Sequence, residues 1–477
     1  MKWVSILCLL LAFESTSAQM RNSPWLIPQG NRIDFAQGGT IASNGPILGA
    51  HAGSSMSDAI GQVLLSVNYL DLRSSNGSII AEMIPLVLPH WNTTQAFLIV
   101  PKPGTVARYM VFLIDQPSYA RAGYLEVDIE ANGGSGGLVE PSITWYMDSC
   151  GAKLTAVPHA NGQDYWILNH EWPSSEFHAY ALTAAGLDTI PVVSDTGPFL
   201  DDWDIGGQPI HFSGPLVPSE NGEWLAMSGH HLFYAMQPEP VLALFTFNAA
   251  LGTVQHVVDF PGHNKVDGIE FSGNGDVLYI ADQFRQGIDT HFDVWQYDLS
   301  SGDAATIAAS GIMLDQTISL EAQQASTLTM SRAPNGKIYF WRAWDDPYLS
   351  VINFPNVVGT GCDLQHEALQ CTSSIYGGLP NQMKRFHDSF LETTVVENPA
   401  ATTMTFYPVP LSENGRIDHG LTDRQLDLEW FDASGRSVRR ERTGDGSVSR
   451  RGLNAGHYMV VARQKDQIVQ RFCWPVQ

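Results

Sequence analysis

Short runs of alternating apolar and polar residues, separated by glycine turns, recur along most of the chain. In one unit a glycine turn precedes a strand of apolar and aromatic residues, as in Gly162-Gln-Asp-Tyr-Trp-Ile-Leu and Gly275-Asp-Val-Leu-Tyr-Ile-Ala. The turn glycines stand at positions 61, 104, 162, 222, 275 and 336, so the intervals are 43 to 61 residues. Alternation with period two predicts β-strands that are buried on one face. No long helical periodicity competes with this pattern.

A second unit lies between these strands and consists of an alternating strand, a glycine turn and a further strand. Examples are Leu244-Phe-Thr-Phe before Gly252 and Val294-Trp-Gln-Tyr-Asp-Leu before Gly302. Four short strands in each period of this length are typical of a β-propeller blade. We therefore predict an all-β fold whose main part is a β-propeller. A set of separate β-sandwiches is the alternative, which is disfavoured because sandwiches do not repeat one unit six times.

Six periods are visible, and the two ends of the repeat region can supply a seventh blade. Residues 31–35 and 40–42 would form its outer strands, and the stretch after Gly378 would form its inner strand. Pairing both ends in one blade leaves no free sheet edge. We expect a seven-bladed ring over residues 25–390.

Residues 1–18 have the pattern of a secretory signal peptide. Lys2 precedes an apolar run from Trp3 to Phe13, and Thr16 and Ala18 give a small-x-small ending. A buried N-terminal helix is the alternative, but Ser-Thr-Ser is poor helix material. No later stretch reaches the roughly 18 to 20 apolar residues of a membrane helix, so no transmembrane segment is expected. The sequence predicts export, with the product secreted or on the outer cell surface.

Four cysteines follow the predicted signal peptide: Cys150, Cys362, Cys371 and Cys473. They are too few for a disulfide scaffold and form no zinc-binding Cys-x-x-Cys pair. Cys362 and Cys371 bracket a short loop, and an oxidising exterior would allow them to form a disulfide. Two unpaired thiols are the alternative.

The composition changes near residue 400. The chain has 26 Lys+Arg and 49 Asp+Glu, of which residues 401–477 hold eleven and nine. The first 400 residues are therefore strongly acidic, which argues against binding of nucleic acid by a basic surface. Residues 391–403 form a Thr/Val-rich linker, and residues 404–477 show alternating strands divided by turns such as Asp432-Ala-Ser-Gly435. This pattern predicts a small C-terminal β-sandwich.

The repeat region resembles a family of secreted propeller proteins of Bacteroidetes bacteria that includes lactonase-like members. The similar segments are Phe97–Gly104, Lys153–Ile167, Glu176–Tyr180, Pro191–Ser194, Gly268–Ser272, Trp295–Ser300 and Leu349–Cys362. The resemblance implies a propeller fold, and it brings no established catalytic residues with it.

The C-terminal region resembles the sorting domain of the type IX secretion system. The resemblance rests on an opening motif, a Gly-Arg turn and a Gly-x-Tyr strand, represented by Tyr407, Pro408, Pro410, Gly435, Arg436, Gly456 and Tyr458. It implies that the type IX machinery is a partner and carries the protein across the outer membrane. Val409 stands where the family usually has Asn. An ordinary appended β-sandwich that binds carbohydrate or packs on the propeller is the alternative.

Few residues suggest chemistry. His170 and Glu171 follow a predicted strand and could face the central channel, although a loop without chemistry is favoured. His230, His263 and His291 fall in different parts of the repeat, where surface or edge positions are the favoured interpretation.

Gly133–Gly137 formally fits the Gly-x-Ser-x-Gly nucleophile motif, but it links two strands and is favoured as a hairpin turn. The sequence shows no other catalytic motif and no metal-ligand spacing, and it does not indicate a cofactor. We expect an exported, non-enzymatic propeller that binds a protein or a glycan through its loops or its central channel. The alternative is a propeller hydrolase, lactonase or lyase whose metal is held by carboxylates and histidines in the channel. Fold alone does not decide between them, because function depends on the site.

Overall fold

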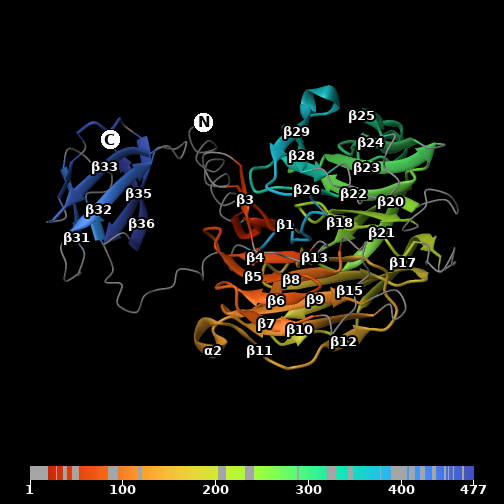
Figure 1. Ribbon diagram of the computed structural model, residues 1–477, viewed down its shortest axis with the longest axis horizontal. Coiled ribbons are helices and arrows are strands. Elements are labelled where there is room, and N and C mark those ends of the chain that lie inside the picture. Colours follow the sequence, from red (N-terminus) through yellow and green to blue (C-terminus); the bar gives the residue numbers. More distant parts are fainter. Residues whose placement is uncertain are drawn as a thin grey trace. The chain divides into compact units, whose positions relative to one another are not determined.

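The computed structural model divides the chain into two compact units, Met1–Thr394 and Val395–Gln477 (Figure 1). The described residues are 20–27, 30–35, 40–45, 53–83, 95–115, 121–201, 211–230, 241–286, 289–319, 329–341, 347–375, 378–387, 405–407, 414–418, 425–431, 437–444, 447–449, 451–454, 456–464 and 467–476. The predicted signal peptide and linker, residues 1–18 and 391–403, lie outside them and stay predictions. Within the described part, no helix is both long and apolar enough to cross a membrane.

Six antiparallel sheets of four or five strands follow one another along the first unit and form blades 1 to 6. Blade 1 contains β4 (Ser54–Ser57), β5 (Val63–Val67), β6 (Asp71–Ser74) and β7 (Ile79–Glu82). Blade 2 contains β8 (Phe97–Pro101), β9 (Arg108–Ile114), β10 (Ala122–Asp128), β11 (Gly137–Leu138) and β12 (Thr144–Met147). Blade 3 contains β13 (Leu154–Pro158), β14 (Tyr165–His170), β15 (Ser174–Thr183), β16 (Gly186–Leu187) and β17 (Val192–Leu200).

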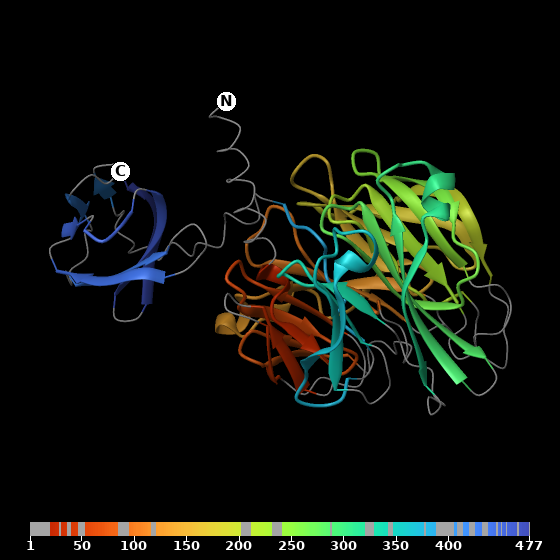
Figure 2. The ribbon, with the colours of Figure 1, turned by 90° about the horizontal axis from the view of Figure 1, so that it is seen from above.

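The next three blades have four strands each. Blade 4 contains β18 (Leu216–Pro218), β19 (Trp224–Gly229), β20 (Val241–Asn248) and β21 (Thr253–Asp259). Blade 5 contains β22 (Lys265–Phe271), β23 (Val277–Gln286), β24 (Asp289–Asp298) and β25 (Ile312–Ser319), which Figure 2 shows in green as one twisted sheet. Blade 6 contains β26 (Met330–Arg332), β27 (Ile338–Trp341), β28 (Tyr348–Ile352) and β29 (Leu364–Gln370). Short helices α2 (Ala131–Gly134), α3 (Ala304–Ala309) and η3 (Gly359–Cys362) lie in connections.

The seventh blade comes from the N-terminal residues. After the short helix η1 (Met20–Asn22), the strands β1 (Trp25–Ile27), β2 (Asn31–Asp34) and β3 (Ile41–Asn44) form a three-stranded sheet. The first strand of each of blades 1 to 5 contacts the first strand of the next blade, and β1 of the seventh blade contacts β4 of blade 1. This is the all-β, seven-blade propeller arrangement that the sequence predicts.

The stretch after Gly378 does not form the inner strand of the seventh blade that the sequence predicted. Residues 378–387, the axial segment, lie beside β1, where Asn22 Nδ2 donates a hydrogen bond to Met383 O at 2.7 Å. Pro380 has no N–H, and Asn381 N donates to Gly53 O of blade 1 at 2.9 Å, so neither residue donates to a ladder with β1. Among the described residues this sheet therefore has three strands.

The two faces of the propeller differ. The turns that join the first and second strands of blades 1 to 6 contain glycines with positive φ, at positions 61, 104, 162, 222, 275 and 336. Glycine adopts this left-handed conformation without steric cost, which is why tight turns use it. We call the face with these turns the turn face. The repeat unit of the sequence thus corresponds to one structural turn in each blade.

The opposite face carries the links from one blade to the next, and we call it the loop face. Strands of a blade are antiparallel and consecutive, so the links from second to third strands and from one blade to the next all leave at this face. Several of these links are long: β17 ends at Leu200 and β18 begins at Leu216, and β19 ends at Gly229 before β20 begins at Val241.

Apolar side chains between neighbouring blades form the core of the propeller. The largest cluster extends from Met56 in β4 through blades 2 and 3 to Phe247 in β20. It also includes Met383 and Phe386 of the axial segment. The segment is therefore part of the core of the ring.

The second unit contains two antiparallel sheets with a core of their own. Strands β30 (Thr405–Tyr407), β31 (Asn414–Asp418) and β34 (Ser447–Ser449) form one sheet. The other has the order β33 (Ser437–Thr443), β32 (Leu426–Phe431), β35 (Gly456–Gln464) and β36 (Gln467–Val476). The core cluster joins Ile417 and Val448 of the first sheet to Trp430 and Val460 of the second, so the sheets pack face to face.

Cys362 and Cys371 do not form the disulfide that the sequence suggested. Cys362 is buried beside Phe340 between blades 5 and 6, whereas Cys371 is buried in the cluster that contains Trp25. Strand β29 runs between them and pairs with β28 from Ile352 to Tyr348. At about 3.3 Å per residue this pairing covers about 13 Å, and a disulfide needs Cα atoms less than about 7 Å apart. The extended strand keeps the two thiols apart.

Candidate functional site

The axial segment runs through the central channel from the loop face to the turn face. At the loop face, Asn381 Nδ2 donates to Phe97 O at 3.0 Å and to Leu154 O at 3.2 Å, at the beginnings of β8 and β13. At the turn face, His387 Nε2 lies 2.5 Å from Asp164 O, in the turn before β14. Contacts with several blades hold the segment in place, so the chain itself fills the channel.

Among the described residues, a small cavity lies at the axis beside this segment. Its volume is about 40 Å³, and its lining includes Thr155, Asp267, Ser331, Asn381 and Lys384. Small-molecule sites are usually about 300–1,000 Å³ in volume. The cavity can hold a few water molecules but not a sugar ring.

Ionisable side chains are buried near the loop face between blades 4 and 5. His230 follows β19, and its Nε2 lies 3.0 Å from Asp267 Oδ1 of β22. Lys265 Nζ lies 3.2 Å from Asp267 Oδ2. All three side chains are less than 5% exposed. Buried charges are costly unless they are paired, and here one carboxylate offsets one lysine and one histidine.

A second pair lies next to the first. His263 Nδ1 is 3.3 Å from Asp282 Oδ2, and its Nε2 is 2.7 Å from the Tyr297 hydroxyl. Asp282 Oδ1 accepts hydrogen bonds from the backbone N–H groups of Asn264 and Lys265 at 2.9 and 3.0 Å. These bonds fix both side chains before any ligand arrives.

Two aspartates of this network have shifted pKa values in opposite directions. Burial alone would raise the pKa of Asp267, but Lys265 and His230 outweigh it and the pKa lies below its usual value. Burial raises the pKa of Asp293 in β24, and the nearby Asp282 adds to the rise. Opposite shifts of neighbouring carboxyls are frequent at functional sites and also occur in structural ion-pair networks. We call His230, His263, Lys265, Asp267, Asp282 and Asp293 the blade 4–5 network.

Surface or edge positions, which the sequence favoured for His230, His263 and His291, are wrong, because the structure buries all three. They belong to neighbouring blades, His230 to blade 4 and the other two to blade 5. His230 meets Asp267 of the next blade, whereas His263 meets Asp282 and Tyr297, which are distant in sequence but lie in its own blade.

His170 and Glu171 are adjacent in sequence, but the His170 side chain is fully buried whereas that of Glu171 is partly exposed. His170 is fully buried at the end of β14, where its ring packs edge-on against Phe177 with centroids 4.6 Å apart. Its Nδ1 lies 2.6 Å from Glu171 O. Burial first, and Lys153 second, lower the pKa of His170 to about 3, so the ring stays neutral. His170 has a structural position and does not line the channel.

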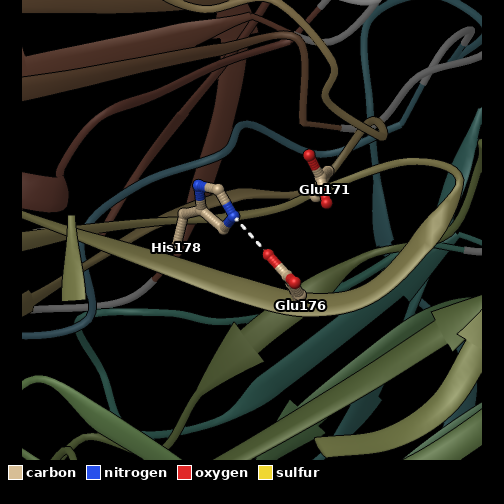
Figure 3. A group of neighbouring side chains, drawn as sticks. All are labelled: Glu171, Glu176 and His178. Atoms are coloured by element: carbon tan, nitrogen blue, oxygen red, sulfur yellow. Dashed lines mark hydrogen bonds and ion pairs between the residues drawn. The ribbon is translucent and has the colours of Figure 1, made fainter. Parts of the chain in front are cut away.

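Glu171 instead lies beside Glu176 and His178 at the loop face of blade 3 (Figure 3). Each offers one ligand atom, and these atoms lie within 4.8 Å of one another. The sequence analysis named Glu171 but missed the other two residues. The Glu176-x-His178 spacing could have revealed them, because alternate residues of a strand share one face.

The residues of the proposed sorting motif lie partly outside the described part of the chain. Pro408, Pro410, Gly435 and Arg436 are outside it, whereas Tyr407 and Gly456 lie in β30 and β35. Tyr458 is buried, and its hydroxyl donates to Asn454 O at 3.0 Å. The structure gives Tyr458 a packing role and leaves the sorting function a prediction.

No known family model matches the chain, and no curated protein sequence does. Among solved structures, a provisionally assigned 6-phosphogluconolactonase from Bacteroides uniformis is 10% identical with a TM-score of 0.41, covering 74% of this chain and 96% of that one. The BP39L lectin from Burkholderia pseudomallei is 11% identical with a TM-score of 0.40, covering 70% and 92%. PorZ, a surface component of the type IX secretion system of Porphyromonas gingivalis, is 10% identical with a TM-score of 0.15, covering 95% and 86%. These similarities are too weak to transfer a ligand or an activity to this chain.

Proposed function

We propose that this protein is an exported propeller scaffold that binds a protein or a glycan through its loop face. The difference between the two faces carries the proposal. At one face, tight glycine turns join the first and second strands of blades 1 to 6, whereas the links from one blade to the next all leave from the other. Connecting loops on a rigid scaffold are the usual place for binding residues.

The hydrolase or lyase alternative, with a metal in the central channel, has less support. The axial segment leaves a cavity of about 40 Å³ in the channel. The charged groups that line it, Asp267 and Lys384, already form ion pairs with Lys265 and Glu270. A substrate would have to displace the axial segment from the core before it reached these groups.

A glycan array with three forms of the protein tests the binding proposal. The first is the unchanged protein, the second has the link between Asp201 and His211 replaced by an equal number of Gly and Ser residues, and the third carries Asn161→Ala in a turn of the turn face. We expect the loop replacement to lose the bound glycan class and Asn161→Ala to keep it. Loss in the turn variant alone would place the ligand on the other face and contradict the proposal.

Export through the type IX system is the second part of the proposal, supported by the N-terminal leader pattern and the motifs of residues 404–477. Deleting residues 404–477 should retain the propeller in the periplasm of a host that has this system. Immunoblots of the periplasm, outer membrane and medium measure this. A truncated protein that still reached the cell surface would show that the C-terminal unit is not a sorting domain.

A further inference from the structure

We propose that Glu171, Glu176 and His178 bind a divalent metal ion of the zinc class at the loop face of blade 3. Figure 3 shows Glu176 and His178 facing each other from one strand, with Glu171 beside them on the preceding connection. This site is separate from the channel and does not depend on the proposed binding function.

The backbone brings the three residues together. Glu176 and His178 are alternate residues of β15, so their side chains leave the same face of the sheet. Glu171 N donates to Glu176 O at 2.9 Å, which holds the preceding connection against the strand. Ser174 Oγ accepts a hydrogen bond from Glu176 N at 3.0 Å and fixes the beginning of the strand. Two of the ligands therefore come from β15, and the third comes from the preceding connection, which a backbone hydrogen bond holds against this strand.

The distances are close to those that a metal needs. His178 Nε2 lies 3.2 Å from Glu176 Oε2. Zinc–ligand distances of about 2.0–2.1 Å place tetrahedral ligand atoms about 3.4 Å apart. All three ligand atoms lie within 4.8 Å of one another. Glu176 is 37% exposed at its side chain, so a small rotation can bring its carboxylate into place.

The charge at this place favours a cation. Two carboxylates lie together, and among the described ion pairs neither is joined to a lysine or arginine. The imidazole of His178 is the one basic group that the structure pairs with them there. Like charges at short distance repel, and a divalent cation would relieve this repulsion.

The donor set selects the type of metal. Imidazole nitrogen suits zinc and its neighbours in the transition series, whereas Ca²⁺ and Mg²⁺ prefer sites made of oxygen. His178 Nδ1 lies 3.4 Å from the Tyr180 hydroxyl. When Nε2 binds the metal, Nδ1 carries the proton and can donate it to this hydroxyl, as metal-bound histidines usually do to an acceptor. Tyr180 is therefore a positioning residue.

Three protein ligands leave a fourth coordination position open. This position would accept water or an oxygen atom of a ligand at the loop face. The bound metal would thus keep one exchangeable ligand position.

Titration of the full secreted chain with ZnCl2 after treatment with a chelator tests the proposal. Calorimetry should show one strong site per chain, with Ca²⁺ at least about tenfold weaker. Glu176→Gln and His178→Ala should each weaken zinc binding at least about tenfold, and Tyr180→Phe about tenfold as expected for an outer-shell partner. Co²⁺ bound in place of Zn²⁺ should show the visible absorption of a four-coordinate site, and His178→Ala should remove it.

Glu223→Gln is the matched control, because Glu223 is a carboxylate in a turn of the turn face. It should bind zinc as the unchanged protein does. Melting curves in the presence of chelator identify any variant that fails to fold. If one of Glu176→Gln and His178→Ala does not fold, the zinc affinity of the other still tests the proposal. No zinc binding, a preference for Ca²⁺, or zinc binding unaffected in a folded His178→Ala protein would each overturn the proposal.

Discussion

Buried ionisable side chains tie separate blades together at single positions. Lys153, fully buried at the beginning of blade 3, donates from Nζ to the carbonyl oxygens of His211, Phe212 and Ser213 at 3.1 to 3.2 Å. These carbonyls belong to the connection that enters blade 4. Burial lowers the pKa of Lys153 to about 7. The residue holds a loop-face connection against the ring.

His170 should make the propeller less stable in mild acid. Its pKa is about 3 when folded and about 6.5 when unfolded, so the unfolded chain takes up the proton first. The stability from this group is complete above pH 6.5 and is lost as pH falls toward 3. Between pH 7.5 and 5.5 the loss should be about 1 kcal/mol. Urea unfolding at both pH values measures it.

The variant His170→Gln isolates this contribution, because glutamine can still donate to Glu171 O but does not titrate. Its unfolding free energy should fall about 1 kcal/mol less than that of the unchanged protein over the same pH range. An equal decrease in both proteins would show that His170 is not the group responsible.

Among the elements, the axial segment is joined to blade 5 by an ion pair with a buried carboxylate. Lys384 Nζ lies 2.5 Å from Glu270 Oε2, and the Glu270 side chain is 1% exposed. The same oxygen accepts from Arg332 N at 2.7 Å. The Arg332 guanidinium pairs with Glu220. The Arg332 guanidinium therefore already has a carboxylate partner and does not neutralise Glu270 in place of Lys384.

Lys384→Met should destabilise the propeller by about 3 kcal/mol, because it leaves the Glu270 carboxylate buried without its counter-charge. The double variant Glu270→Gln, Lys384→Met should lose less than the single lysine variant. Denaturant unfolding followed by tryptophan fluorescence gives both values.

Arg32→Met is the control, since Arg32 and Asp34 form an ion pair in blade 7 with both side chains about one third exposed. Its cost should be less than about 1 kcal/mol. A double variant less stable than Lys384→Met alone would mean that the ion pair is not what holds the segment.

The blades could be predicted from sequence, whereas the path of the axial segment could not. Each blade depends on local features, a glycine turn and alternating strands, which are visible in residues such as Gly162 and Gly275. The position of Asn381 depends on carbonyl groups of Gly53, Phe97 and Leu154, which meet only in the closed ring. The same reason explains why the burial of the blade 4–5 network had no sequence signal.

The whole molecule consists of two parts, a propeller with two different faces and a C-terminal unit with a core of its own. The propeller has a turn face with glycine turns between first and second strands and a loop face with the links between blades. The C-terminal unit has its own core cluster, which shares no residue with the clusters of the propeller. Each unit therefore has the buried apolar surface that independent folding requires.

Trp430→Ala should unfold the C-terminal unit at lower temperature and leave the propeller unchanged. Trp430 is fully buried, donates from Nε1 to Glu441 Oε1 at 2.8 Å and packs edge-on against Tyr458. Its loss should cost this unit about 3 kcal/mol. Calorimetry should show two unfolding transitions. A fragment of residues 1–394 identifies which of them belongs to the propeller. Trp430→Ala should lower the temperature of the other transition only. Equal shifts of both transitions would show that the two units unfold as one.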